Sequence, residues 1–153
     1  LGSTNKISEE REFYKKIFQK IKFVLIERNN KRKTYDILDK SKIIINIDST
    51  AGYEALSRSN KVGFFCIRGN RYPFNSLRFG WPNSFKSRGI FWTNKNNYKE
   101  LKRVMDYLDK VSYQKFISKS KKISKIIMNS DPGNTILRNY MHKFINGNLW
   151  TFY

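Results

Sequence analysis

The chain of 153 residues is long enough for one domain with a hydrophobic core and too short for two sizeable domains. It carries 31 Lys and Arg against 12 Asp and Glu, a net charge of +19, which indicates an anionic partner such as nucleic acid, an anionic membrane or phosphate-bearing carbohydrate precursors. No apolar stretch is long enough to span a bilayer and no signal-peptide pattern occurs, so we expect a cytoplasmic protein, or one peripheral to the inner membrane.

The first 40 residues predict two helices with a strand and a loop between them. The apolar spacing of residues 8–22 is typical of an amphipathic helix, and Ser8 is expected to cap it. We expect a strand over residues 23–26 and a polar loop over residues 27–33. Thr34 should then cap a short helix that ends at Lys40.

Residues 43–67 predict a βαβ unit. Residues 43–47 are apolar apart from one Asn, which predicts a central strand that helices cover on both faces. A helical pattern from Ala51 to Leu56 follows, and residues 62–67 form a second apolar run. So short a connection makes the two strands parallel, and their carboxyl ends then open on the same edge. The fold class is therefore α/β, with a Rossmann-like parallel sheet flanked by helices and with additional C-terminal helices.

Polar residues gather where the first of these strands ends. Asp48, Ser49 and Thr50 stand at a strand's carboxyl end and a helix's N-terminus, where free N–H groups favour anions. Gly52 would let a ligand approach the backbone closely. Glu54 is out of register for a capping box, so we expect its carboxylate to accept hydrogen bonds from sugar or ribose hydroxyls. An ordinary helix cap at Ser49 or Thr50, and a solvated Glu54, remain alternatives.

Several segments of the chain resemble bacterial surface-carbohydrate transferases, which are lipopolysaccharide or O-antigen glycosyltransferases of the two-domain GT-B type. The match spans roughly residues 35–140, and its core is Ser49-Thr50-Ala51-Gly52-Tyr53-Glu54-Ala55. The other matching segments are residues 35–40, 48–58, 61–62, 64–65, 89–93 and 131–134.

The resemblance implies that the chain is the C-terminal, donor-binding half of a GT-B enzyme, in which a nucleotide sugar sits against this half. The acceptor, and often the catalytic base, come from an N-terminal domain that would be missing here. We expect residues 1–153 to form a single nucleotide-sugar-binding domain, with a terminal helix over residues 134–145. Residues 1–3 lack an initiator Met and are interpreted as a cloning scar or a truncation.

Residues 68–93 predict a long functional loop rich in arginine, aromatic residues, Pro and Gly. Arg68 follows the second strand and could bind a diphosphate or an anionic sugar. Arg71, Arg88 and Trp92 are secondary candidates for donor binding. Alternatively, the arginines are surface groups and the aromatic side chains form a satellite core. Interleaved basic and aromatic residues are also used by single-stranded nucleic-acid binders.

The remainder predicts helices and few chemical groups. Helical periodicity covers residues 98–108 and 116–127, whose lysine-rich faces could contact anionic lipid headgroups, and Asn134 should cap the last helix. Cys66 is expected to be a buried thiol, and His142 a surface residue. One His and one Cys argue against a zinc site or a nucleophilic triad, so the catalytic residues stay unknown and no metal is predicted.

Together these features predict a donor-binding domain for surface-polysaccharide synthesis, with the nucleotide sugar as substrate and no cofactor. Two alternatives remain open. One is a basic nucleic-acid-binding module, which predicts steeply salt-dependent affinity for oligonucleotides. The other is a nucleotide-sugar epimerase-like enzyme, whose acid and base residues are not evident in the sequence.

Overall fold

A computed structural model of the chain describes residues 6–26, 33–70, 72 and 74–146. These residues belong to two compact units, residues 1–41 and residues 42–153, which are described separately below. Among the described helices, none combines the length and the apolar character needed to cross a bilayer.

The first unit contains α1 (Ile7–Phe18) and α2 (Lys33–Lys40). Lys6, and not Ser8, stands at the N-cap of α1, and the helix ends where Gln19 takes a positive φ of 42°. No strand forms over residues 23–26, which are irregular and whose Phe23 packs on α1 through Tyr14 and Phe18. Both the strand and the Ser8 cap were therefore wrong predictions. Of the predicted loop over residues 27–33, residues 27–32 lie outside the described residues and Lys33 belongs to α2.

With Thr34 as its cap the helix would begin at Tyr35, whereas α2 begins two residues earlier at Lys33, so Thr34 lies within it and is not its cap. Its last turn is closed by the hydroxyl of Ser41, which donates to the carbonyl of Ile37 at 2.7 Å.

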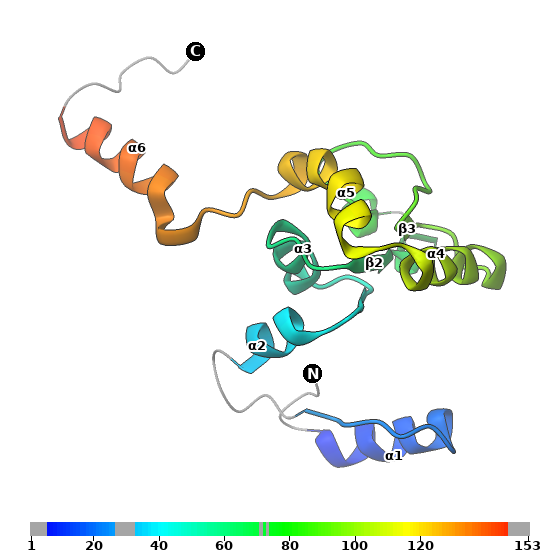
Figure 1. The fold of residues 1–153 in the computed structure, drawn as a ribbon. Coiled ribbons are helices and arrows are strands. Elements are labelled where there is room, and N and C mark those ends of the chain that lie inside the picture. The colour runs from blue at the N-terminus through cyan, green and yellow to red at the C-terminus, as the bar shows by residue number, and fades with distance from the viewer. Residues whose placement is uncertain (1–5, 27–32, 71, 73, 147–153) are drawn as a thin grey trace. The chain divides into compact units, whose positions relative to one another are not determined.

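A parallel sheet of three short strands organises the second unit (Figure 1). The strands are β1 (Ile44–Asn46), β2 (Val62–Phe65) and β3 (Trp92–Thr93), in the order β1-β2-β3. Ile44 pairs with Val62, and Phe64 pairs with Trp92. The predicted α/β class and the parallel pairing of the first two strands are thereby confirmed.

The prediction that residues 43–47 form the central strand was wrong, because β2 holds the centre and β1 lies at an edge of this sheet. All four residues of β2 are buried, as expected for a strand with a neighbour on each side. Ile45 and Ile47, by contrast, are 48% and 50% exposed. The apolar run was a correct signal for a strand, but it did not report how many neighbours the strand would have.

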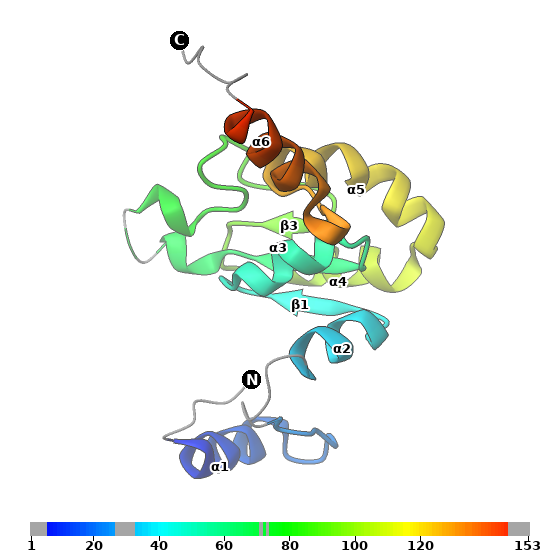
Figure 2. The same ribbon diagram turned by 90° about the vertical axis from the view of Figure 1, so that its left-hand side faces the viewer.

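The described helices of the second unit are α3 (Thr50–Ser57), α4 (Tyr98–Lys110), α5 (Tyr113–Ile127) and α6 (Thr135–Ile145). Figures 1 and 2 show α3 and α4 on opposite faces of the sheet. Residues of β2 alternate between these faces, since Gly63 lies against Val104 and Leu108 of α4 while the Phe64 ring stacks on Tyr53 of α3. The sheet is therefore covered on both sides.

Aromatic side chains from the long segment after β2 complete the core. This segment contains the short 3-10 helices η1 (Ile67–Asn70) and η2 (Asn75–Leu77). Phe79 and Phe91 are at most 1% exposed; the Phe79 ring packs edge-on against Phe64, and the Phe91 ring is tilted against it. Phe91 also contacts Phe116 of α5, so these rings belong to the main core and not to a satellite cluster.

The last helix follows a third 3-10 turn, η3 (Pro132–Asn134). Asn134 stands at the N-cap of α6 in a left-handed conformation, but its side chain makes no capping hydrogen bond. Asp131 serves instead, because its Oδ2 accepts from the backbone N–H of Ile136 at 2.9 Å. The prediction of a turn followed by a helix is confirmed, whereas the identity of the capping side chain was wrong.

Candidate functional site

The carboxyl ends of β1 and β2 bring two of the predicted site residues together. Asp48 follows β1, Arg68 lies in η1 directly after β2, and Arg68 Nη1 is 3.1 Å from Asp48 Oδ2. The Asp48 side chain is largely buried, whereas the Arg68 side chain is 56% exposed and accessible to a ligand. Because parallel strands end on one edge of a sheet, both residues lie where the carboxyl ends of β1 and β2 meet the N-terminus of α3, a place called the corner below.

Ser49 caps α3, which is the alternative to a ligand-binding role that the sequence left open. Its hydroxyl oxygen accepts from the N–H of Ala51 at 3.3 Å, and its own N–H donates to Asn46 Oδ1 at 3.3 Å. Thr50 is the first residue of the helix and is exposed. Its N–H donates to none of the described residues, so the positive end of α3 presents a free donor to solvent.

Glu54 lies one turn further along α3 and is half-buried. Within the described part of the chain, its carboxylate takes part in no hydrogen bond or ion pair. The Glu54 side chain therefore has no structural partner there, and its predicted contact with ligand hydroxyls stays a prediction.

Gly52 is buried against Asn46, which gives this glycine a packing role. A Cβ at position 52 would overlap the Asn46 side chain, whose Nδ2 is itself buried and has no hydrogen-bond partner among the described residues. The missing Cβ thus lets α3 approach β1 closely. The predicted role of Gly52 in admitting a ligand stays a prediction.

Substituting Gly52→Ala should lower the free energy of unfolding by about 1–3 kcal/mol, because the new methyl group overpacks the contact with Asn46. Urea denaturation followed by circular dichroism measures this loss. Adding Asn46→Ala should recover much of it by creating space, so the double-mutant cycle should show strong coupling. Additive losses would contradict the packing role.

Tyr53 and Cys66 were not predicted as site residues, yet they lie beside the same corner. Tyr53 Oη accepts from the N–H of Gly80 at 3.0 Å and so ties the loop after η2 to α3. Its ring stacks on Phe64 with centroids 4.7 Å apart. No local signal predicts this tie, because Gly80 is 27 residues away in the sequence.

Burial also controls the chemistry of these two groups. Burial raises the pKa of Tyr53, and it raises the pKa of the Cys66 thiol to about 12, with the negative charge of Asp48 as a further cause. Cys66 is only 2% exposed, so the predicted buried thiol is confirmed. Neither group is ionised near neutral pH, which excludes the Cys66 thiolate as a nucleophile there.

The Cys66 thiol should resist alkylation by iodoacetamide at pH 8 in the folded protein and react readily in urea. Because folding raises this pKa from 9.0 to about 12, the neutral thiol favours the folded state. Its contribution to stability should be complete below pH 9 and should fall as the pH rises toward 12. Cys66→Ala should remove this part of the pH dependence, and equal reactivity in the two states would contradict the account.

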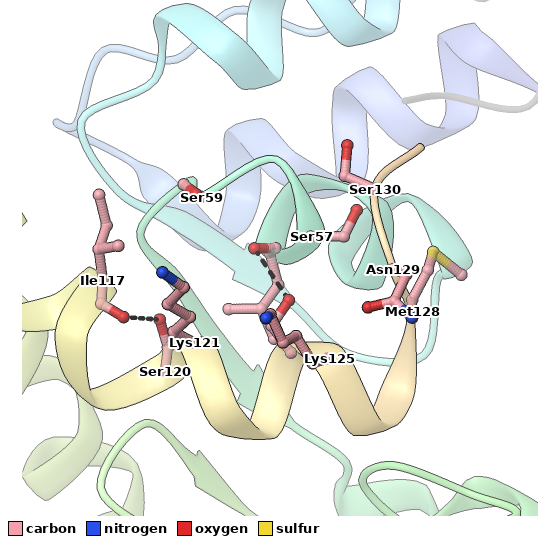
Figure 3. Close-up of a pocket in the computed structure, with 11 residues that line it drawn as sticks. Ser57, Ser59, Ile117, Ser120, Lys121, Lys125, Met128, Asn129 and Ser130 are labelled. Carbon is pink, nitrogen blue, oxygen red and sulfur yellow. Dashed lines mark hydrogen bonds between the residues drawn. The ribbon is translucent and has the colours of Figure 1, made fainter. Parts of the chain in front are cut away.

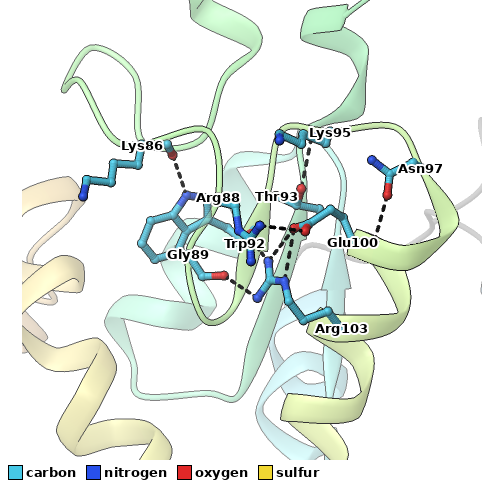
Figure 4. A network of polar contacts seen from close by, with 9 residues as sticks. All are labelled: Lys86, Arg88, Gly89, Trp92, Thr93, Lys95, Asn97, Glu100 and Arg103. Carbon is cyan, nitrogen blue, oxygen red and sulfur yellow. Dashed lines mark hydrogen bonds and ion pairs between the residues drawn. The ribbon is translucent and has the colours of Figure 1, made fainter.

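The secondary candidates Arg88 and Trp92 belong to a different polar network (Figure 4). Arg88 Nη1 is 3.3 Å from Glu100 Oε1, and the Trp92 indole N–H donates to the carbonyl of Lys86 at 3.0 Å. Arg103 donates to Glu100 Oε2 and to the carbonyls of Gly89 and Trp92. These contacts hold residues 88–93 against α4.

The network gives Arg88 and Trp92 structural tasks. The hydrogen bond from Arg103 holds the pKa of the Glu100 carboxyl below its usual value, so Glu100 remains anionic between two guanidinium groups. The Trp92 side chain is only 7% exposed and stacks on Phe79 at 4.6 Å. Their predicted donor contacts stay predictions, and Arg71 lies outside the described residues.

The corner can therefore bind a ligand that carries both phosphate and hydroxyl groups, through hydrogen bonds and charge. A guanidinium and a free helix N–H suit phosphate oxygens, whereas the carboxylates of Asp48 and Glu54 suit hydroxyl donors. No group of three or more His, Cys, Asp or Glu side chains lies together among the described residues in a way that could hold a metal ion.

A comparison with protein families matches residues 2–145 to a model described as "putative O-antigen biosynthesis protein". The match covers nearly the whole chain. Searches of curated proteins and of solved structures gave no significant match.

Proposed function

Because the chain belongs to this family of putative O-antigen biosynthesis proteins, we propose that it binds the nucleotide-sugar donor of a glycosyltransferase. In this proposal the second unit is a Rossmann-like half of a GT-B enzyme, and the corner at Asp48, Ser49, Thr50, Glu54 and Arg68 is the donor site. A separate N-terminal domain would supply the acceptor and the catalytic base.

The single observation that carries the proposal is the Asp48–Arg68 ion pair beside the N-terminus of α3. It places an exposed guanidinium, a carboxylate and the free N–H of Thr50 at the carboxyl edge of a parallel sheet, where ligands of α/β proteins bind. A nucleotide sugar needs all of these groups, because its diphosphate requires donors and its sugar and ribose hydroxyls require acceptors.

The same mixture favours a nucleotide sugar over an oligonucleotide. Asp48 and Glu54 would repel the regularly spaced phosphates of a nucleic-acid backbone, whose binding depends on neutralisation by Lys and Arg. A nucleotide sugar concentrates its negative charge on one phosphate or diphosphate group, so its hydroxyl groups can turn toward the two carboxylates while Arg68 meets the phosphate oxygens.

In the reaction, Arg68 and the free N–H of Thr50 at the start of α3 would stabilise the negative charge that develops on the leaving nucleotide. Asp48 keeps Arg68 at the corner through the ion pair and would turn toward a hydroxyl when the diphosphate engages the guanidinium. This scheme needs neither a metal nor a further cofactor. Contact of exposed lysines with an anionic membrane, near membrane-bound acceptors, is part of the same proposal.

A thermal-shift screen with UDP-, GDP-, CMP- and dTDP-sugars, beside a short oligonucleotide, tests the function. A ligand that binds only the folded state stabilises it by about 2.7 kcal/mol at one hundred times its Kd, which raises the melting temperature by several degrees. At least one nucleotide sugar should do so, and the matching free sugar should not. Stabilisation by the oligonucleotide alone, with steep salt dependence, would instead identify a nucleic-acid-binding module.

A further inference from the structure

A groove of about 250 Å³ lies between the C-terminal end of α3 and the length of α5 (Figure 3). Its described lining comprises five serines, two lysines, one asparagine and three apolar side chains, and it includes no carboxylate. The groove is therefore polar and carries positive charge. Ser49 caps the opposite end of the eight-residue helix α3, which is about 12 Å long, so the groove is separate from the corner at Asp48.

Three of the five serine hydroxyls that line this groove donate hydrogen bonds to backbone carbonyls, so their oxygen atoms are left as acceptors. Ser57 Oγ donates to the carbonyl of Glu54 at 2.7 Å, and Ser120 Oγ donates to the carbonyl of Ile117 at 3.3 Å. Ser124 Oγ donates across the groove to the carbonyl of Leu56, at 3.5 Å. Each of these three hydroxyl groups already donates its proton, but its oxygen atom can still accept a hydrogen bond from a ligand that carries several hydroxyl groups.

Two lysines supply hydrogen-bond donors and positive charge, which complement the serine acceptors. Lys121 and Lys125 are four residues apart and therefore share one face of α5, and both extend toward α3 in Figure 3. Each ammonium group offers three donors and a full charge. Asn129 adds an amide that can both donate and accept. A carboxylate or phosphate group would be held between the two ammonium groups by charge-assisted hydrogen bonds.

We propose that this groove binds an acidic sugar, that is, a saccharide ring that carries a carboxylate or a phosphate. The ring hydroxyls donate to the serine oxygens while the anionic group meets Lys121 and Lys125. The volume fits one such ring, since it exceeds the cavity of about 150 Å³ that admits benzene and lies below the roughly 300–1,000 Å³ of sites for drug-sized ligands. The inference rests on the groove alone and does not depend on the donor site.

Calorimetric titration of the full chain with glucose 6-phosphate, glucuronate, glucose and inorganic phosphate tests the ligand class. Glucose 6-phosphate and glucuronate should each bind at least about tenfold more tightly than glucose, and glucose 6-phosphate should exceed inorganic phosphate by a similar factor, because both halves of the ligand are recognised. Equal affinity for inorganic phosphate and glucose 6-phosphate would overturn the sugar assignment. Absence of binding by both acidic sugars would overturn the site.

Lys121→Ala combined with Lys125→Ala should weaken the binding of glucose 6-phosphate by about tenfold or more. The matched control is Lys122→Ala combined with Lys143→Ala, which removes the same charge from exposed positions that do not line the groove. The control should leave the affinity within about twofold. Equal losses in both double variants would overturn the proposal, because they would show that only the overall charge matters.

Discussion

Substituting Phe64→Ala should lower the free energy of unfolding by about 3–5 kcal/mol, which is a large share of the roughly 5–15 kcal/mol that stabilises a typical domain. The Phe64 ring is 0% exposed and lies at the centre of the sheet. It stacks on Tyr53 and packs against Phe79 and Phe91, with centroids 4.7, 5.0 and 6.4 Å away. Truncation would remove all three contacts and leave a cavity between α3 and the aromatic segment.

Urea denaturation measures the effect, and Phe74→Ala is the matched control. The Phe74 side chain is 60% exposed, so its removal should change the free energy of unfolding by no more than about 0.5 kcal/mol. If both variants lost the same small amount, the aromatic rings would not form the core described above.

Lys61→Ala should also lower the free energy of unfolding, by about 1–3 kcal/mol. Lys61 is only 6% exposed, and its Nζ donates to the carbonyls of Leu108 and Val111, both at 2.6 Å. These carbonyls belong to the C-terminal end of α4, where helix carbonyls lack partners and favour a positive charge. Without the ammonium group, both would lose their donor.

Lys99→Ala is the control for this prediction. Lys99 carries the same charge as Lys61 but is an exposed residue of α4, the helix whose C-terminal end Lys61 contacts. Its removal should leave the midpoint of chemical denaturation nearly unchanged. Lys61→Met separates the two contributions, since it keeps most of the buried chain but donates no hydrogen bond. We expect Lys61→Met to be nearly as destabilising as Lys61→Ala, and wild-type stability in Lys61→Met would contradict the capping role.

The elements of the βαβ unit could be predicted because their signals are local. A β-branched run followed by a helical pattern correctly predicted a strand and a helix, and the cap at Ser49 was one of two roles that the sequence left open. The position of β1 at the edge of the sheet could not be predicted in the same way, because it depends on which other segments pair with β2. The predicted strand over residues 23–26 failed for a similar reason, since four apolar residues are compatible with irregular chain packed on α1.

The candidate site was predicted as far as the sheet geometry allows. The rule that parallel strands end on one edge brought Asp48 and Arg68 together correctly, although they are 20 residues apart. The sequence did not predict the structural contacts of Arg88, which was a candidate for donor binding, or of Lys61. Their partners, Glu100 and the end of α4, lie 12 to 50 residues further along the chain. Such contacts exist only in the folded chain and leave no local pattern.

The most direct test of the donor site is a calorimetric titration of the nucleotide sugar found in the thermal-shift screen, with the wild type and with Arg68→Ala. The loss of charge-assisted hydrogen bonds to the diphosphate should cost about 1.5–3 kcal/mol, which weakens the affinity by roughly 10- to 150-fold. Arg138→Ala, which removes the same charge from an exposed position on α6, should bind as tightly as the wild type. Unchanged affinity in Arg68→Ala would contradict the proposal that this corner holds the donor.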